Sequence, residues 1–301
     1  MKGRKVVIPP QAIHSKEHAV AGGGVPGTMS IVIPVLNEAH HLLELLPRLA
    51  RQSLRPLEVL VADANSSDGS RKVARRLGAT VISGGRPAAG RTAGALAAEA
   101  EWVCFLDADT RLPDDTFLER ALRDVVSQGL AAAVADNRAS YRPGDRGFHR
   151  WWIRAWDRFL LGSLNSGQRG WLRAGFPVGQ AVFMLVRRDV FLEVGGFDSS
   201  AEPYEDSELL LKIHRRIAPE PGRSSSVGVL SPPLHVLIST RRWDVKGRLW
   251  FPVALGLRGS LLRWLFRKEL PIPAYWDVNA RGDYLESPVD EDKPGDTPPG
   301  H

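Results

Sequence analysis

Two carboxylates follow an apolar run near the middle of the chain, where Phe105-Leu106 leads into Asp107-Ala108-Asp109. Mg²⁺ and Mn²⁺ are hard cations that bind oxygen ligands, commonly one or two carboxylates together with the phosphates of a substrate. Asp107 and Asp109 therefore predict a divalent metal site next to a phosphorylated substrate. Short motifs also match by chance, and two acids in a solvated loop explain these residues equally well when they are taken alone.

The sequence around this pair alternates between short β-rich runs and helical stretches. Strands are expected over residues 30–35, 57–62, 80–82 and 102–106, and helices over residues 38–51, 70–77, 88–100 and 113–126. Repeated βα units predict an α/β fold with a Rossmann-like, mainly parallel sheet flanked by helices. Ligands of such sheets bind beyond the carboxyl ends of the strands. Because Asn37, Asp63 and Asp107 each follow a strand, we expect them to converge on one edge of the sheet.

Three motifs occupy these strand ends in order. They are Pro34-Val35-Leu36-Asn37-Glu38, then Asp63-Ala64-Asn65-Ser66-Ser67-Asp68-Gly69, then Asp107-Ala108-Asp109. Together they resemble family-2 glycosyltransferases, and the resemblance extends over about residues 29–217. It implies a GT-A fold, a nucleotide-sugar donor, and a single displacement that inverts the anomeric carbon of the sugar.

The resemblance also assigns roles to the residues at these strand ends. Asp109 would bind Mn²⁺ or Mg²⁺ directly, whereas Asp107 would contact the ribose or a metal-bound water. Asp68 is expected to cap the helix that follows it. The residues assigned to the nucleotide are Pro34, Asn37, Glu38 and Asp63.

A glycine-rich stretch, Gly84-Gly85-Arg86-Pro87, is followed by Arg91. In the family that this chain resembles, an arginine near the diphosphate often precedes an asparagine at this place. We therefore expect Arg91 to contact the donor. The asparagine position holds Thr92 in this chain, so no equivalent contact is expected from that residue.

A second acidic pair comes later, where Val194-Gly195-Gly196-Phe197-Asp198 is followed by Tyr204-Glu205-Asp206. This resembles the family's second signature, whose carboxylate is the catalytic base, and we assign that role to Asp206, with Glu205 beside it. An acceptor hydroxyl is a poor nucleophile and needs a base to take its proton, while a metal stabilises the departing diphosphate. Acids in the first turn of a helix also stabilise its N-terminus, which is the structural alternative.

Ser239-Thr240-Arg241-Arg242-Trp243 faintly resembles the Gln-x-x-Arg-Trp element of processive members, with serine in place of glutamine. We expect Arg241 or Arg242 to contact phosphate and include Arg242 among the donor-binding residues. His235 could complete the metal site, although a lone histidine beside an apolar run is more often structural.

We expect one large folded unit with terminal appendages, since 301 residues with 43% hydrophobic content can bury a sizeable core. A flexible leader is predicted over residues 1–28 and a GT-A domain over residues 29–240. This domain divides into a nucleotide-sugar half, residues 29–136, and an acceptor half, residues 137–240. An amphipathic helical C-terminal extension and a disordered acidic tail follow, over residues 241–285 and 286–301.

The charge of the chain indicates an anionic partner. The formal net charge is +6, but the last 25 residues carry seven acids and two bases, which leaves +11 on the remainder. Nucleic acid is not expected, because no helix-turn-helix, zinc or RNA-recognition pattern is present. Residues 148–171 and 249–267 combine tryptophan with arginine, which suits an anionic membrane surface or stacking on sugars, although core packing explains the first segment equally well. We expect a cytoplasmic protein, with attachment to the inner face of the membrane as a further hypothesis.

The sequence thus predicts a metal-dependent inverting glycosyltransferase that uses a UDP- or GDP-sugar. Its acceptor would be a lipid-linked molecule, an envelope glycan or a small molecule. A nucleotidyltransferase also uses paired acids, but usually opens with a glycine- and arginine-rich phosphate loop that residues 34–38 do not form. A degenerate sugar-nucleotide-binding scaffold is the non-enzymatic alternative, suggested by Thr92 and Ser239. The presence of all four acids at positions 107, 109, 205 and 206 argues against it.

Overall fold

The computed structural model of the chain describes residues 25–141, 150–179, 182–201, 204–217, 219 and 225–240. The expected C-terminal extension, the acidic tail, Arg241 and Arg242 lie outside the described residues. The same holds for the leader up to residue 24. The expectation of a leader through residue 28 is wrong at its end, because residues 25–28 already belong to the first strand.

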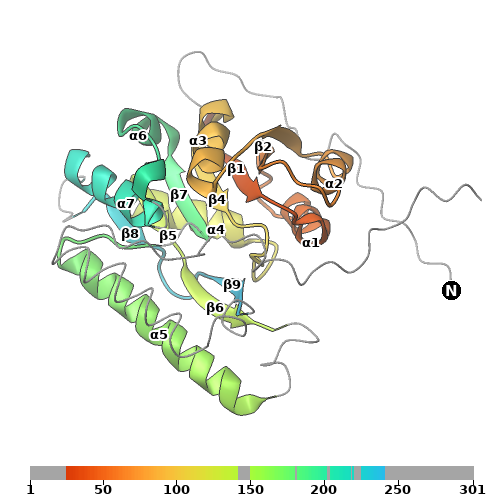
Figure 1. Cartoon of the computed structure of the whole chain (residues 1–301). Coiled ribbons are helices and arrows are strands. Elements are labelled where there is room, and N and C mark those ends of the chain that lie inside the picture. Colours follow the sequence, from red (N-terminus) through yellow and green to blue (C-terminus); the bar gives the residue numbers. More distant parts are fainter. Residues whose placement is uncertain are drawn as a thin grey trace, which may run out of the picture. The chain divides into compact units, whose positions relative to one another are not determined.

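The elements alternate between strands and helices through the first half of the chain (Figure 1). In chain order they are β1 (Val25–Val35), α1 (Ala39–Ala50), β2 (Glu58–Asp63), α2 (Ser70–Arg76), β3 (Thr80–Ser83), α3 (Pro87–Ala97), β4 (Ala100–Leu106), α4 (Phe117–Ser127), β5 (Ala132–Val134), β6 (Asp136–Ser140), α5 (Trp151–Arg173), β7 (Phe183–Arg187), α6 (Arg188–Glu193), the 3₁₀ turn η2 (Ser199–Ala201), α7 (Glu205–Arg216), β8 (Val227–Val229) and β9 (His235–Ser239).

Seven strands form the central sheet, in the order β3-β2-β1-β4-β7-β5-β8. The neighbours β3, β2, β1 and β4 pair in parallel, whereas β7 runs antiparallel to both β4 and β5. Val35 pairs with Asp63, and Val32 pairs with Phe105. The carboxyl ends of β1, β2 and β4 therefore meet at one edge, as the sequence predicted, and the α/β fold class is confirmed.

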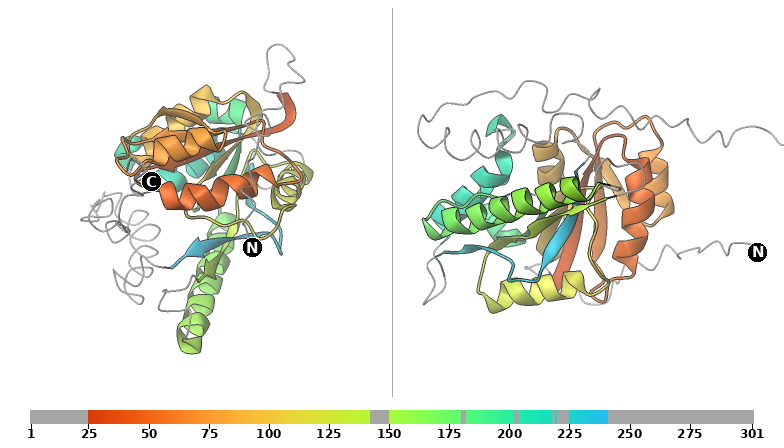
Figure 2. Two further views of the ribbon diagram at one scale, coloured as in Figure 1. Left: turned by 90° about the vertical axis from the view of Figure 1, so that its right-hand side faces the viewer. Right: turned by 90° about the horizontal axis from the view of Figure 1, so that it is seen from below.

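Apolar residues alternate between the two faces of the sheet, so that each face carries its own core. On β4, Cys104 and Leu106 pack against helices α1 and α4. Val103 and Phe105 face the other way, toward α3, α6 and α7. Successive side chains of a strand point to opposite faces, and this alternation gives the helix-sheet-helix layers seen in Figures 1 and 2.

A second, two-stranded sheet pairs β6 with β9 in parallel. The long helix α5 lies against it, and Leu160 and Leu161 pack with Ala139 and Ile238 in a small separate cluster. The view from below in Figure 2 shows α5 running across the small sheet. This small sheet and α5 belong to the expected acceptor half, together with β7, α6, α7 and β8.

Helix α3 lies unusually close to the sheet because glycines face the strands. A Cβ atom added at Gly94 would lie 2.2 Å from Cγ1 of Val32 on β1. At Gly84, before the helix, a Cβ would lie 2.6 Å from the carbonyl carbon of Ala62. Both distances are far below van der Waals contact, so the position of α3 depends on these residues having no side chain.

We expect Gly94→Ala to lower the free energy of unfolding by about 1–3 kcal/mol, the usual loss when a packed core is overfilled. Chemical denaturation measures this change. Gly162→Ala on α5 is the matched control, because nothing lies within 4 Å of its added Cβ and a helix gains stability when glycine becomes alanine. If Gly94→Ala is as stable as the wild type, Val32 can move aside without lowering the free energy of unfolding, and the prediction is wrong.

Candidate active site

The centre of the site is the side chain of Arg91 on α3. One of its terminal nitrogens, Nη1, lies 3.1 Å from Oε1 of Glu205 and 3.2 Å from Oδ1 of Asp206. The other, Nη2, donates to Oδ1 of Asp107 at 2.8 Å. Arg91 is 4% exposed. A single buried cation therefore joins the first acid after β4 to the acidic pair that opens α7.

Electrostatics keep this arginine charged. Burial by itself disfavours the guanidinium cation, but Asp206, Asp107 and Glu205 raise the pKa of Arg91 above its ordinary value. The ring of Phe197 also lies 5.8 Å from the guanidinium carbon, within the range of a cation–π contact. Arg91 is consequently a fixed positive charge at every physiological pH.

The acidic pair does more than stabilise a helix end. Both acids lie in the first turn of α7, whose N-cap residue, Tyr204, makes no side-chain capping hydrogen bond. Glu205 is 2% exposed and its side chain turns into the protein toward Arg91, whereas the side chain of Asp206 is 17% exposed. Of the two carboxylates, that of Asp206 is the more exposed to solvent.

A short turn presents the acids that follow β4. The amide of Asp107 donates to the carbonyl of Val182 at 3.2 Å, and the amide of Thr110 donates to the carbonyl of Asp107 at 3.0 Å. This turn holds Asp107 and Asp109 at the carboxyl end of the strand, where both are partly exposed. Within the described residues, no three potential ligands of the His, Cys, Asp and Glu types gather around a metal position. Asp107 and Asp109 fit a metal whose remaining ligands come from a substrate.

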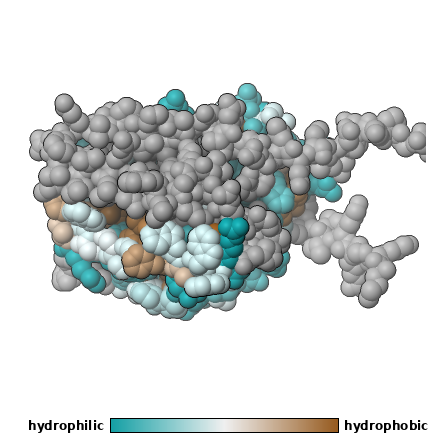
Figure 3. All heavy atoms as spheres, turned by 60° about the horizontal axis from the view of Figure 1, so that its bottom comes forward, coloured by the Kyte–Doolittle hydropathy of each residue, from teal (hydrophilic) through white to brown (hydrophobic). Residues whose placement is uncertain are grey.

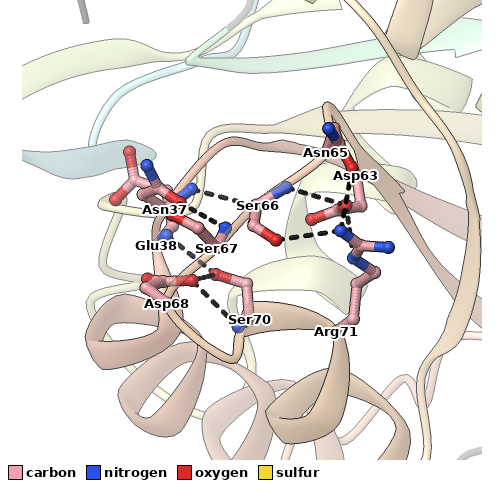
Figure 4. Close-up of polar contacts among 9 residues, drawn as sticks. All are labelled: Asn37, Glu38, Asp63, Asn65, Ser66, Ser67, Asp68, Ser70 and Arg71. Atoms are coloured by element: carbon pink, nitrogen blue, oxygen red, sulfur yellow. Dashed lines mark hydrogen bonds and ion pairs between the residues drawn. The ribbon is translucent and has the colours of Figure 1, made fainter. Parts of the chain in front are cut away.

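The loops after β1 and β2 are tied together by hydrogen bonds (Figure 4). Asn37 adopts a left-handed conformation with φ of 55°, which asparagine tolerates better than most residues. Its amide donates to Oγ of Ser66 at 2.9 Å, and its side-chain oxygen accepts from the amide of Ser67 at 2.9 Å. Asn37 therefore shapes the predicted nucleotide site by fixing both loops.

Asp68 joins the two helices that begin at these loops. Its Oδ1 accepts from the amide of Ser70 at 2.9 Å, and its Oδ2 accepts from the amide of Ala39 at 2.9 Å. The N-cap residue of α2 is Gly69, and Asp68, one residue earlier, accepts from the first amide of α2 and from the first amide of α1. The carboxylate of Glu38 contacts Nδ1 of His41, so in this structure its charge is directed into the protein.

Asp63 is buried at the end of β2, and its two carboxylate oxygens have different environments. Oδ2 accepts from the amide of Ser66 at 3.1 Å and lies 2.9 Å from Nε of Arg71. Oδ1 is buried and has no hydrogen-bond partner among the described residues. Since buried polar atoms in proteins nearly always have a partner, this oxygen is a candidate acceptor for a ligand N–H group.

Arg71 is a residue of the site that sequence reasoning missed. Besides its contact with Asp63, its Nη2 donates to Oδ1 of Asn65 at 3.0 Å and to the carbonyl of Ser66 at 2.9 Å. It lies in the first turn of α2, and Figure 4 shows it reaching back under the loop. Eight residues separate it from Asp63, and this spacing is no recognisable motif.

The structure places the remaining predicted residues as follows. Pro34 lies near α3, with its Cβ 3.8 Å from the position of an added Cβ at Gly90. Nδ1 of His235 lies 2.6 Å from the carbonyl oxygen of Pro233, and His235 does not join the acids in a metal cluster of the described residues. Arg242 lies outside the described residues.

We expect Arg91→Met to lower the free energy of unfolding by about 3–5 kcal/mol, because it leaves the buried carboxylate of Glu205 without a counter-charge. Thermal unfolding measures the loss. Arg91→Lys is the matched control, and it should retain more stability because the charge stays. Equal stability of Arg91→Met and the wild type would contradict this interpretation.

Comparison with known proteins adds to this geometry. The model of the family described as Glycosyl transferase family 2 matches residues 30–195, more than half of the chain. The succinoglycan biosynthesis protein ExoA of Rhizobium meliloti (strain 1021) is 33% identical over 190 residues, which cover 60% of this chain and 56% of that protein. The chain thus spans about half the length of this relative.

Two solved structures share the fold. A mannosyltransferase from Pyrobaculum calidifontis, in complex with GDP-Man and Mn²⁺, is 18% identical with a TM-score of 0.51, and the match covers 84% of this chain and 68% of that one. Glucosyl-3-phosphoglycerate synthase from Mycobacterium tuberculosis, with Mn²⁺, UDP and glucosyl-3-phosphoglycerate, is also 18% identical with a TM-score of 0.51, covering 77% and 80%. The expected GT-A fold is confirmed, and the chain belongs to glycosyl transferase family 2.

Proposed function

We propose that this glycosyltransferase takes its sugar from a UDP- or GDP-sugar, binds the donor with Mn²⁺ or Mg²⁺, and inverts the anomeric carbon. The proposal rests on the cluster of Asp107, Glu205 and Asp206 around the buried side chain of Arg91. It brings the predicted donor-binding acid and the predicted base to one place at the carboxyl edge of the sheet.

The charge of this edge supports a metal. Asp107, Glu205 and Asp206 share the single positive charge of Arg91. A donor diphosphate adds further negative charge, so a divalent cation held by Asp109 and Asp107 would make donor binding favourable. When bound, such a metal stabilises the diphosphate as it leaves. The similar structures that hold Mn²⁺ support this choice of cofactor.

Asp206 is the proposed catalytic base. Its partly exposed carboxylate takes the proton of the acceptor hydroxyl while the hydroxyl oxygen forms a bond to the anomeric carbon. The bond from that carbon to the diphosphate oxygen breaks, and its electron pair leaves with the diphosphate. Arg91 holds the carboxylate of Asp206 in place. Glu205, which is more deeply buried, completes the set of contacts that fixes Arg91.

Asp63 is proposed to contact the base of the nucleotide. Its buried Oδ1 can accept one hydrogen bond from a ring N–H group. Uracil and guanine carry such a group, whereas cytosine and adenine present exocyclic amines instead. A ring N–H requirement therefore favours UDP- and GDP-sugars, and the similar structures contain GDP-Man and UDP. Pro34, Asn37 and Glu38 would form the remaining wall of this nucleotide site.

The acceptor is proposed to be a glycan, lipid-linked or in the cell envelope. The relative named for succinoglycan biosynthesis supports this class. A nucleotidyltransferase is no longer a competing interpretation, because the family assignment covers the first acidic motif and both nucleotide loops. The acidic pair at positions 205 and 206 lies beyond the matched residues, so its catalytic role rests on geometry.

Isothermal titration of UDP and GDP, with and without Mn²⁺, tests the donor and the metal. We expect one of the two nucleotides to bind in a metal-dependent manner, and Asp109→Ala to weaken that binding by at least about tenfold. Asp115→Ala is the matched control, since Asp115 is an exposed acid that pairs with Arg51. Absence of binding by both nucleotides under all conditions would overturn the proposal, whereas equal binding without Mn²⁺ would remove the metal from it.

Arg71→Ala should weaken nucleotide binding by about tenfold, because Asp63 loses the cation that orients it and a buried carboxylate is left under-satisfied. The metal dependence of binding should stay unchanged, since Arg71 lies at the base and not at the diphosphate. Lys72→Ala, at the exposed neighbouring position, is the matched control. The same titration measures all three proteins, and wild-type affinity in Arg71→Ala would show that Asp63 keeps its orientation unaided.

A further inference from the structure

Helix α5 exposes large aromatic side chains to solvent. Trp151 is 79% exposed, Trp152 is 53% exposed and Phe159 is 66% exposed. Trp156 extends this group, because its ring lies 5.9 Å from that of Phe159. A monomeric protein seldom exposes neighbouring aromatic groups of this size unless they bind something. The described functional site does not use them.

The opposite face of α5 packs against the rest of the protein. Ile153, Leu160 and Leu161 are buried, and the hydroxyl of Tyr141 donates to the carboxylate of Asp157 at 2.8 Å. Asp157 is the single acid among residues 151–173, and it is 0% exposed. The outer face of α5 therefore carries no negative charge.

Basic residues accompany the aromatic ones on this outer face. The exposed arginines of α5 and its N-terminal boundary are Arg150, Arg154, Arg158 and Arg173. Figure 3 brings the lower side of Figure 1 forward and shows pale and brown surface broken by teal patches on the described part of this side. Exposed aromatics beside cations, with the acid turned inward, are typical of helices that lie in a membrane interface.

We propose that the outer face of α5 binds an anionic membrane surface. Trp151, Trp152 and Phe159 would enter the boundary between headgroups and acyl chains, where amphipathic aromatic rings are stable. Arg154 and Arg158 would contact lipid phosphates, each adding to the attraction of a negatively charged leaflet. Among the residues that the structure describes, no helix combines the length and the apolar character of a membrane span.

Other occupants of this face fit less well. The segment over residues 241–285 has nine bases and four acids, so its charge repels the arginines of α5. A second copy of the chain would bring two basic faces together and meets the same repulsion. The acidic tail, residues 286–301, has a favourable charge, but Val289 is its single residue of the aliphatic or aromatic types.

The helix is attached to the sheet firmly enough for its binding to orient the domain. The side-chain oxygen of Asn165 accepts from the amide of Asn137, and the side-chain nitrogen of Asn165 donates to the carbonyl of Asn137, at 3.1 and 3.0 Å. Arg169 and Asp136 form an ion pair at 2.6 Å. A membrane under α5 would thus hold the small sheet at a fixed angle, which suits an acceptor that is anchored in the same membrane.

Flotation with lipid vesicles tests this inference on the full chain. We expect the wild type to co-float with vesicles of phosphatidylcholine and phosphatidylglycerol at low salt, and to stay behind with phosphatidylcholine alone. High salt should weaken the binding. Arg154→Glu with Arg158→Glu should reduce the vesicle-bound fraction more than about tenfold, and Trp151→Ser with Phe159→Ser should reduce it further than high salt does.

Matched controls separate α5 from the rest of the surface. Arg75→Glu with Arg76→Glu makes the same charge change on α2, where both residues are exposed. Leu43→Ser with Leu96→Ser removes exposed apolar side chains from α1 and α3. These variants should co-float as the wild type does. Failure of the wild type to bind anionic vesicles would overturn the inference, as would equal losses in the α5 variants and their controls.

This inference goes beyond the proposed transfer reaction, and the two can fail separately. Metal-dependent nucleotide titration reports on the donor site, which contains no residue of α5. Variants of α5 that still bind nucleotide and no longer co-float would support the membrane role alone. If the wild type binds nucleotide but does not bind anionic vesicles, the proposed function stands and the membrane inference is wrong.

Discussion

The geometry of the active site depends on the ion pairs of Arg91. Asp107 follows β4, Glu205 and Asp206 open α7, and 115 residues separate Arg91 from Asp206. Without a cation between them, these carboxylates would repel one another at short range, and Glu205 would be a buried charge with no partner. A buried charge is stable only when it is paired and hydrogen-bonded. The guanidinium satisfies both conditions because its rigid fork donates from two terminal nitrogens at once.

Core packing determines where that guanidinium lies. Arg91 belongs to α3, and the distance from α3 to the sheet is set by Gly94 over Val32 and by the close approach of Gly84 to Ala62. A methyl group at either position would push the helix or its leading loop outward. The same displacement would move Arg91 away from Asp107, whose position is fixed by the end of β4. Packing and electrostatics in this domain are therefore coupled through one helix.

The sequence predicted those features of the site that follow from the order of strands and helices along the chain or from contacts between near neighbours in sequence. Asn37, Asp63 and Asp107 lie at adjacent strand ends, as expected, because the βα alternation determines which strand ends share an edge. The contact of Asp68 with the start of α2 was also predictable, since it depends on a residue two positions away. Helix α4, by contrast, begins at Phe117 and not at Pro113, because the carboxylate of Asp114 binds the amide and hydroxyl of Thr116 and stabilises a turn there.

Contacts between distant residues were less predictable. The apolar residues of β7 predict a strand, but they do not indicate whether that strand runs parallel or antiparallel to its neighbours. Arg71 was missed because its partners lie in a loop whose path is set by left-handed residues at Asn37 and Asn65. The grouping of Glu205 with Arg91 needed the packed position of α3. In each case the controlling fact is a three-dimensional distance that no local pattern of residues encodes.

The structure changes the expected role of Arg91, which the sequence analysis assigned to donor binding. Its terminal nitrogens are already engaged by three carboxylates, and 4% exposure leaves little of it for a substrate. It cannot also neutralise an incoming diphosphate without releasing an acid that it holds. In the proposed reaction, the charge of the diphosphate would be met by another cation, which the carboxylates of Asp109 and Asp107 would hold. Arg91 would then contribute to that reaction by fixing the acids.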